Sequence, residues 1–254
     1  MNISKIENSI NKSYMNISTG KKVNTAADNA ATLGIIQGMQ SQVTGYNVGN
    51  NNAKDGQNLI NVADGAISSI TDSLQRMKEI SVQASNGIYT AEDKQFMQYE
   101  IDQLKEHISN VAKNTEFNTI KILDGSKADI NLATNPSGTG MSIHTANTTL
   151  ETLGISDFDV TKDFDISDID EAIQKVSNSR SGLGATSNRL DATISYNNTA
   201  AINLTASQDR MEASDIAEEV MNISTKKVLE QYAYFAQAQK QHQQSSLLSL
   251  FQMN

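Results

Sequence analysis

The chain contains no cysteine and no tryptophan, only one proline, and few aromatic residues. The absence of cysteine excludes disulfides, thiolate metal sites and a cysteine nucleophile. With so few large rings, a hydrophobic core must be built from aliphatic side chains, as it is in pairs of long helices. A chain without cysteine fits a cytosolic protein, and equally an exported protein that stays unfolded during transit.

Positive charge and long apolar runs are also scarce. The 254 residues carry a formal net charge of −9, whereas nucleic-acid affinity depends on clustered Lys and Arg. No run of about eighteen apolar residues occurs, and the first residues lack the apolar segment of a signal peptide. We therefore expect neither a nucleic acid nor a membrane as a partner.

Apolar residues of the N-terminal half recur at helical spacing, which predicts long amphipathic helices. The first predicted stripe consists of Leu59, Ala63, Ala66, Ile70, Leu74, Met77, and Val82 or Ala84. Ser85-Asn86-Gly87 predicts a helix end with Gly87 in the left-handed conformation. Thr90 and Asp93 predict a new helix that begins close to the capping-box pattern. The seam of that helix consists of Met97, Ile101, Leu104, Ile108 and Val111.

A second long helix is predicted from residue 169 to residue 211, with Ser167 and Asp170 where a cap would lie. Its apolar positions are Ile169, Ile173, Val176, Leu183, Leu190, Ile194, Ala201, Leu204 and Met211. Polar residues that can fix register and partner choice interrupt the same stripe; they are Arg180, Ser187, Asn197 and Gln208. Gly182 and Gly184 weaken the helix locally, and we interpret them as a place of close helix packing.

The middle of the chain loses the helical period. Ile130 and Leu132 alternate with polar residues before Asn135-Pro136-Ser137-Gly138, and Met141 and Ile143 alternate after it. This pattern predicts a β-hairpin. The predicted fold class is mainly α: a long antiparallel helical hairpin or coiled-coil rod that carries a small β-hairpin insert.

No residue pattern supports catalysis, a metal or a cofactor. His107, His144 and His242 lie in unrelated contexts and are expected to be exposed polar residues. The acidic residues between Asp157 and Glu171 lack the spacing of a calcium loop; a solvated face with negative charge at a helix N-terminus is the favoured interpretation. Gly182-Leu183-Gly184 lacks the third glycine and the preceding strand of a dinucleotide turn.

The last segment, from Val228 to Phe251, has two interpretations. It can be a helix that packs on its own domain, or an intermolecular seam, because apolar residues at an exposed chain end usually need a partner. Amphipathic periodicity does not distinguish the two. The predicted self-assembly seam comprises Leu229, Phe235, Leu247, Leu248, Leu250 and Phe251.

Several short segments follow one another in a characteristic order. The N-terminal half contains ISTGKKVNTAADNAA from residue 17, NAKDG from residue 52, ADGA from residue 63, LQRMKEISVQA from residue 74 and EFN from residue 116. The C-terminal half contains LGA from residue 183, NRL from residue 188 and SLLSL from residue 246. Together they resemble bacterial flagellins over nearly all of the chain except residues 125–165.

The resemblance implies a hairpin-shaped structural subunit that self-assembles into the flagellar filament. Residues 1–30 and 214–254 would form inner-core terminal helices, residues 31–124 and 166–213 a helical rod domain, and residues 125–165 the small insert. The large variable outer domains of many flagellins are missing. Further implications are secretion as an unfolded chain, other flagellin subunits as partners, an export chaperone that binds the C-terminal helix, and a filament cap.

The resemblance also implies an innate-receptor surface. In many flagellins a Toll-like receptor of the host grips an Arg and a Leu on the LQR helix and a Glu on the next helix. The matching residues are Arg76, Ile80 and Glu100, with Ile in place of Leu. Ordinary packing for Ile80 and surface pairing or a subunit contact for Arg76 and Glu100 are the alternative roles.

Other interpretations stay open at this point. Only seventeen residues precede Ser18-Thr19-Gly20, fewer than flagellins usually carry, so we expect a truncated N-terminus or an upstream start. The chain could instead be a hook–filament junction protein or a minor filament component. A helical scaffold is a different class, and an enzyme with a catalytic insert is disfavoured because residues 125–165 hold one His and no metal spacing.

Overall fold

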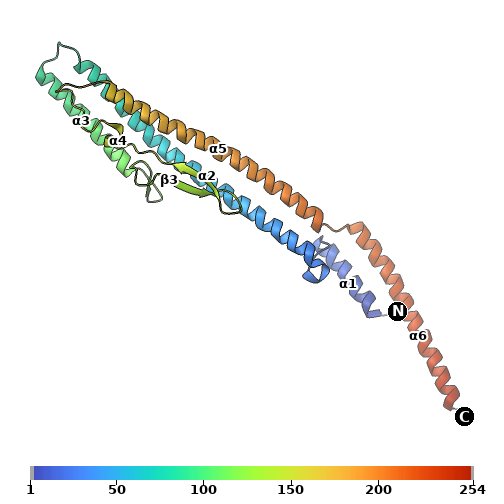
Figure 1. Ribbon diagram of the computed structural model, residues 1–254. Helices are drawn as coiled ribbons and strands as arrows, with labels where there is room; N and C mark the ends of the chain where they lie inside the picture. Colours follow the sequence, from blue (N-terminus) through green and yellow to red (C-terminus); the bar gives the residue numbers. More distant parts are fainter. Residues whose placement is uncertain (1–2, 253–254) are drawn as a thin grey trace. The chain divides into compact units, whose positions relative to one another are not determined.

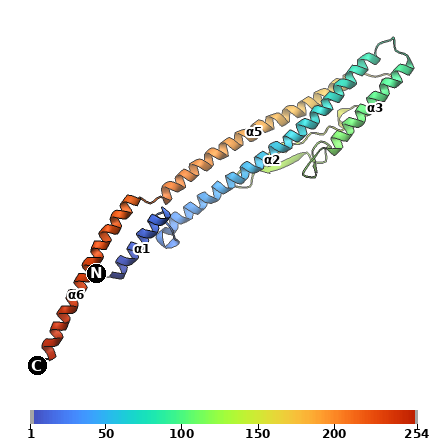
Figure 2. The same cartoon turned by 180° about the vertical axis from the view of Figure 1, so that it is seen from behind.

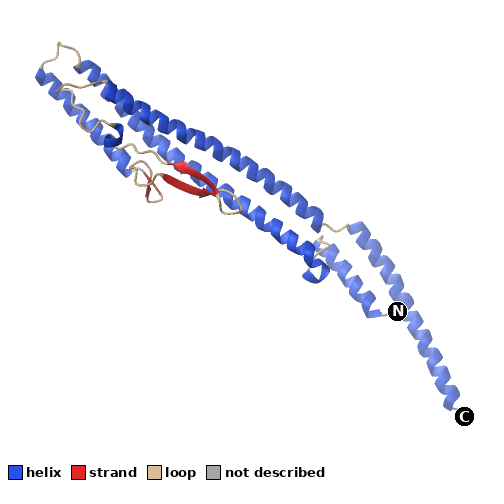
Figure 3. Ribbon diagram, viewed as in Figure 1, coloured by secondary structure: helices blue, strands red, loops and turns tan. Residues whose placement is uncertain are grey.

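The computed structural model describes residues 3–252, with side chains described up to residue 246. The helices are α1 (Ile3–Thr19), α2 (Ala26–Ala84), α3 (Ala91–Asn114), α4 (Leu150–Leu153), α5 (Ser167–Glu212) and α6 (Ile216–Gln252). The strands are β1 (Glu116–Phe117), β2 (Ile120–Lys121), β3 (Asp129–Ala133) and β4 (Gly140–His144). Helices dominate the ribbon in Figure 3, which confirms the predicted mainly α fold.

The chain folds as two units. Unit 1 combines Met1–Gln42 with Ile202–Asn254, and unit 2 is the continuous segment Val43–Ala201. Within unit 2, α2 and α5 run side by side in both views of the ribbon (Figures 1 and 2). The functional domain boundaries expected from the resemblance stay predictions.

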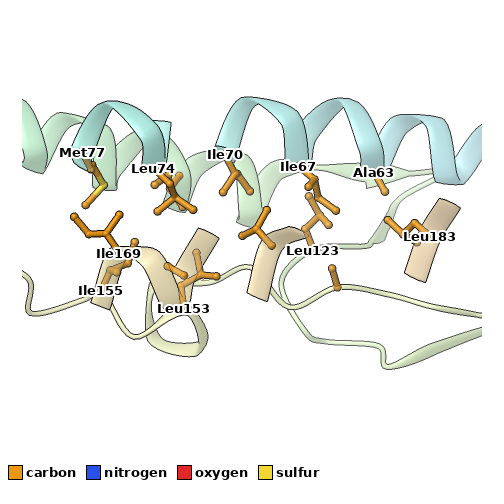
Figure 4. Packing of buried hydrophobic residues seen from close by; sticks show 14 of the residues in the cluster. Ala63, Ile67, Ile70, Leu74, Met77, Leu123, Leu153, Ile155, Ile169 and Leu183 are labelled. Carbon is orange, nitrogen blue, oxygen red and sulfur yellow. The ribbon is translucent and has the colours of Figure 1, made fainter. Parts of the chain in front are cut away.

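The core of unit 2 is aliphatic. The residues of α2 at its centre follow a spacing of four and three and are almost fully buried; they are Ala63, Ile67, Ile70, Leu74 and Met77. Figure 4 shows them facing Leu123, Leu153, Ile155 and Ile169 from other elements. Ala84 is buried whereas Val82 is 55% exposed, so Ala84 is the residue that continues the predicted stripe. All five predicted seam residues of α3 also pack in or against this core.

The turn between α2 and α3 matches the sequence prediction in part. The helix ends at Ala84, as predicted, but Gly87 is not among the described glycines with a positive φ angle. The predicted left-handed cap at Gly87 is therefore wrong. The capping box is confirmed: Thr90 Oγ1 accepts the Asp93 N–H at 3.2 Å, and Asp93 Oδ2 accepts the Thr90 N–H at 2.9 Å.

The long C-terminal helix is confirmed, because α5 runs without a break from Ser167 to Glu212. Its predicted cap is wrong by two residues: Asp165 Oδ1 accepts the Ser167 N–H at 2.9 Å, and Asp170 instead pairs with Lys78 at 2.5 Å. Two of the polar interruptions, Arg180 and Asn197, find partners on other elements of unit 2. Arg180 Nε donates to Asp64 at 2.7 Å, and buried Asn197 donates to a hairpin carbonyl.

The two glycines of α5 have a different role from the predicted one. A Cβ atom at Gly182 or Gly184 would meet no other atom within 4 Å. The interpretation of close helix packing is therefore wrong, because the helix surface at both positions faces open space.

The insert contains the predicted hairpin. Strands β3 and β4 pair antiparallel with Ile130 opposite Ile143, and Gly138 in the turn has a φ angle of +77°. The turn and first strand lie on α2, where glycines admit the backbone: a Cβ at Gly49 would lie 2.5 Å from the Thr134 carbonyl oxygen. The single-turn helix α4 and the two-residue strands β1 and β2 were not predicted from the sequence.

Candidate assembly surfaces

Helices α1 and α6 pair antiparallel within unit 1, mainly through polar side chains. Asn16 Nδ2 donates to Glu219 Oε1 at 2.8 Å, and Lys226 Nζ donates to Ser13 Oγ at 3.2 Å. Further along, the Tyr234 hydroxyl donates to a Glu7 carboxylate at 3.0 Å. Among the side chains of the two helices that the structure describes, the buried apolar ones are few, namely Ile10, Ile223 and Ala233. Such a pair buries too little apolar surface to be strongly stabilised by itself.

The opposite face of α6 is apolar and exposed. Met221, Val228, Tyr232 and Phe235 are spaced seven, four and three residues apart, and each is about two-thirds exposed. At 3.6 residues per turn, these positions form one face on the side away from Ile223 and Ala233. We call these four residues the α6 stripe. Sequence reasoning found only Phe235 among them, although their heptad spacing was a usable signal.

The predicted seam residues are distributed as follows. Leu229 is 38% exposed and Phe235 is 64% exposed, so neither packs fully into its own unit. The side chains of the other four, Leu247, Leu248, Leu250 and Phe251, lie outside the described residues. The seam as a whole stays a prediction.

A short connection joins the ends of the terminal helices. The segment after α1 meets the segment between α5 and α6: the Lys22 N–H donates to the Glu212 carbonyl at 2.7 Å, and the Ser214 N–H donates to the Gly20 carbonyl at 3.0 Å. Gly20 has a φ angle of +69°, a conformation that glycine adopts without strain. We call residues 20–28 and 212–214 the junction.

Carboxylates hold the junction together. The Lys12 ammonium, at 2.8 Å from Asp28, and the N–H groups of Asn24 and Thr25 hold the pKa of Asp28 well below its usual range. Glu212 pairs with the Lys21 ammonium at 2.5 Å, which lowers the pKa of the Glu212 carboxyl. Both carboxylates are therefore charged at neutral pH and tie α1, α2 and α5 to one another.

The receptor residues expected from the resemblance differ in solvent exposure. Arg76 Nε donates to Glu100 at 2.7 Å, and Arg76 Nη1 donates to Glu79 at 3.0 Å, on the exposed surfaces of α2 and α3. These pairs raise the pKa of Arg76. Ile80 is 2% exposed and belongs to the core of unit 2. The structure thus joins Arg76 with Glu100, while Ile80 has the packing role considered as its alternative.

The histidines and the acidic stretch lie at the surface. His107 contacts the Ser69 hydroxyl at 3.0 Å, and His144 contacts Asp129. Asp159 accepts hydrogen bonds from Thr161 and pairs with Lys162. All three histidines are exposed, as predicted. In the described part of the chain no group of three or more His, Cys, Asp or Glu side chains could hold a metal ion.

Comparison with protein families decides the identity. A family model of the bacterial flagellin N-terminal helical region matches residues 1–128, and one of the bacterial flagellin C-terminal helical region matches residues 166–251. The chain belongs to the bacterial flagellin family. This flagellin is 33% identical to the flagellar filament 33 kDa core protein of Treponema phagedenis, over 95% of its own length and 92% of that relative. It is also 33% identical to flagellin from Bacillus subtilis (strain 168), over 94% and 91% of the two chains.

Solved structures agree with the flagellin fold. The crystal structure of Bacillus cereus flagellin is 30% identical, with a TM-score of 0.52 over 58% of this chain and 88% of that chain. A putative flagellar hook-associated protein from Vibrio parahaemolyticus shares the fold with a TM-score of 0.61 at 13% identity, over 73% and 100% of the two chains. The filament-protein relatives do not favour the hook–filament junction alternative.

Membership in the flagellin family gives the class of function of this chain. Flagellins are structural proteins of the extracellular flagellar filament, and this chain is a subunit of that kind. No helix among the described residues is long and apolar enough to cross a membrane. The segment from residue 17 that carries the flagellin resemblance forms most of the junction, so its polar residues bond the chain's own helix ends.

Proposed function

We propose that this flagellin polymerises through the α6 stripe, which contacts neighbouring copies of the same chain in the filament. The observation that carries the proposal is the exposure of Met221, Val228, Tyr232 and Phe235 on the face of α6 away from α1. Aromatic residues and Met are enriched at protein interfaces. A repeat of seven, four and three residues is also the spacing that helices use to pack against one another. The function is structural, without a catalytic role.

A seeding experiment tests this proposal. Purified chain is added to short filament fragments, and elongation is followed by electron microscopy. We expect the parent chain to elongate the seeds and Val228→Ser to raise the critical concentration about tenfold, because a buried Val side chain contributes about 1.5 kcal/mol. Val220→Ser is the matched control, since Val220 is half exposed on α6 but lies outside the stripe. Failure of the parent would contradict the filament function, and equal effects of both variants would contradict the stripe.

We further propose that an export chaperone covers α6 before secretion and that a cap guides assembly at the filament tip. The exposed stripe supports the first idea, because an unassembled chain would otherwise present it to solvent. Co-purification of the full chain with the flagellar chaperone of the same cell, compared with a chain ending at residue 213, tests it. Equal recovery of the chaperone by both chains would contradict this proposal. For the cap, elongation without seeds should require added cap protein.

Innate-receptor recognition is proposed in reduced form. The exposed pair of Arg76 and Glu100 supports it, whereas burial of Ile80 leaves the surface without the apolar contact. We expect Arg76→Ala to weaken signalling in cells that carry the receptor. Arg180→Ala is the matched control, because Arg180 is half exposed and paired with Asp64 in the same unit. Undiminished signalling by Arg76→Ala would rule out this role.

A further inference from the structure

The junction lies next to the ends of both terminal helices. Lys21 follows the last residue of α1, Thr19, by two positions, and Glu212 precedes the first residue of α6, Ile216, by four. Two main-chain hydrogen bonds and the Lys21–Glu212 ion pair bridge these segments, which lie far apart in the sequence. A bridge at this place restrains how α1 and α6 can slide along each other.

Away from the junction, the two helices specify their register weakly. Close to the junction, the buried side chains of Asn16 and Ser13 bond Glu219 and Lys226. Farther along, the bond between Tyr234 and Glu7 is exposed, and an exposed polar pair contributes little free energy. A slip by one turn moves a helix by about 5.4 Å along its axis. Such a slip would displace the α6 stripe from the position that a neighbouring subunit meets.

We call the Lys21–Glu212 ion pair, together with the main-chain hydrogen bonds beside it, the clamp. Glu212 is held from several sides: its carboxylate pairs with Lys21 and accepts from Gln208 at 3.0 Å, and its carbonyl accepts the Lys22 N–H. The Glu212 carboxylate is only 10% exposed in its side chain, whereas Lys21 is half exposed. A pair with one nearly buried member is screened less by water than a pair on the open surface.

We propose that Lys21 and Glu212 are positioning residues for filament growth: they fix the register of α6 along α1 and so place the α6 stripe for the next subunit. The proposal rests on the polymerising role of the stripe. The junction then does more than stabilise the fold of the chain: it also sets the position of the α6 stripe along the axis of α1. Neither residue needs to touch the neighbouring copy.

Charge reversal tests the clamp in seeded elongation. Lys21→Glu and Glu212→Lys each place two like charges at the bridge, and the double variant Lys21→Glu/Glu212→Lys restores opposite charges. We expect each single reversal to raise the critical concentration at least fivefold and the double variant to recover most of the loss. Lys78→Glu, which breaks a surface ion pair within unit 2, is the matched control and should elongate like the parent. Single reversals that elongate like the parent would overturn the proposal, as would a double variant no better than either single one.

A second measurement reports register directly. Because the chain has no cysteine, Glu7→Cys with Tyr234→Cys probes the observed register, and Glu7→Cys with Ala238→Cys probes a shift of one turn. We expect oxidised soluble chain to form the first crosslink predominantly in the parent background, both crosslinks comparably with Lys21→Glu, and mainly the first again in the double variant. Unchanged selectivity with Lys21→Glu would overturn the proposal. If the parent fails to elongate, the filament function fails, while this crosslinking result still decides whether the clamp sets the register.

Discussion

The glycines of α2 differ in what surrounds them. Gly49 lies under the β-hairpin turn, where a Cβ atom would approach the Thr134 carbonyl oxygen to 2.5 Å. Gly65, on the same helix, would present a Cβ to open space. Both glycines lie within α2, so replacing either by Ala brings the same gain in helix propensity. The two sites differ because the β-hairpin covers Gly49 and not Gly65. The hairpin backbone can approach α2 this closely only where α2 has no side chain.

The residue-scale prediction follows from this contrast. Gly49→Ala should lower the free energy of unfolding of unit 2 by about 2 kcal/mol, because the methyl group forces the hairpin backbone away. Gly65→Ala should raise it by up to about 1 kcal/mol through helix propensity. Denaturant unfolding of both variants, followed by circular dichroism, measures the two changes. A stabilised Gly49→Ala variant would show that the turn does not lie on α2.

At the scale of elements, helix ends depend on single capping groups. The reciprocal bonds between Thr90 and Asp93 satisfy two N–H groups at the start of α3, and they lower the pKa of the Asp93 carboxyl. The start of α5 is different, since Asp165 accepts the Ser167 N–H from outside the helix. Both ends place negative charge at a helix N-terminus, where the helix dipole favours it.

The element-scale prediction concerns the capping box. Thr90→Ala removes the hydroxyl that accepts the Asp93 N–H and should lower the free energy of unfolding by about 1 kcal/mol. Thr90→Ser keeps the hydroxyl and should remain close to the parent. Hydrogen exchange at the first turn of α3 checks the local cause, because only the Ala variant should exchange faster there. Equal exchange in the Ala and Ser variants would contradict the cap.

At the scale of the whole chain, aliphatic residues fill the core while aromatic residues lie mostly at the surface. Exposed rings occur in both units, and they include Tyr14, Phe96, Tyr99, Tyr196, Tyr232, Tyr234 and Phe235. In a monomeric globular protein most Phe rings, and many Tyr rings, lie in the core. Their enrichment at interfaces fits a subunit that acquires its neighbours on assembly.

The whole-molecule prediction is a difference in acid sensitivity between the units. Hydrogen bonds and ion pairs, first from Lys12 to Asp28, from Lys21 to Glu212 and from Asn16 to Glu219, lower the pKa of these carboxyls in unit 1. A lowered folded-state pKa gives stability that is present above the unfolded value, about pH 4, and is lost as pH falls through the folded value. Unit 2 also has carboxyls with lowered pKa values, such as Asp93 and Asp159, but they lie in helix caps and turns, and its aliphatic core does not titrate.

Acidification from pH 7 to about pH 3 should therefore loosen α1 and α6 before the core of unit 2 opens. Hydrogen exchange, corrected for the intrinsic pH dependence of the exchange rate, resolves the two units. Glu219→Gln should reduce the pH response in α6, because the titrating group is gone. Simultaneous loss of protection in both units, with no effect of Glu219→Gln, would contradict the prediction.

The local sequence predicted the elements whose signals repeat. The seam of α3, the uninterrupted length of α5 and the alternation of Ile130 and Ile143 each follow from spacing alone. The errors lie where a single residue carried the prediction. Gly87 ends no helix in the left-handed conformation, and Gly182 packs against nothing. The strands β1 and β2 and the helix α4 are too short to produce a period.

The sequence by itself determined the helical seams, the hairpin and the membership in the flagellin family, because each of these rests on local spacing or on an ordered set of short segments. Only the tertiary structure decided which face of α6 is covered, that Ile80 is buried while Arg76 is exposed, and that Lys21 meets Glu212. Periodicity shows that a helix has an apolar face, but not which distant segment covers it. The covering segment is determined only when residues some 190 positions apart come together in the folded chain. In this fold the α6 stripe remains exposed.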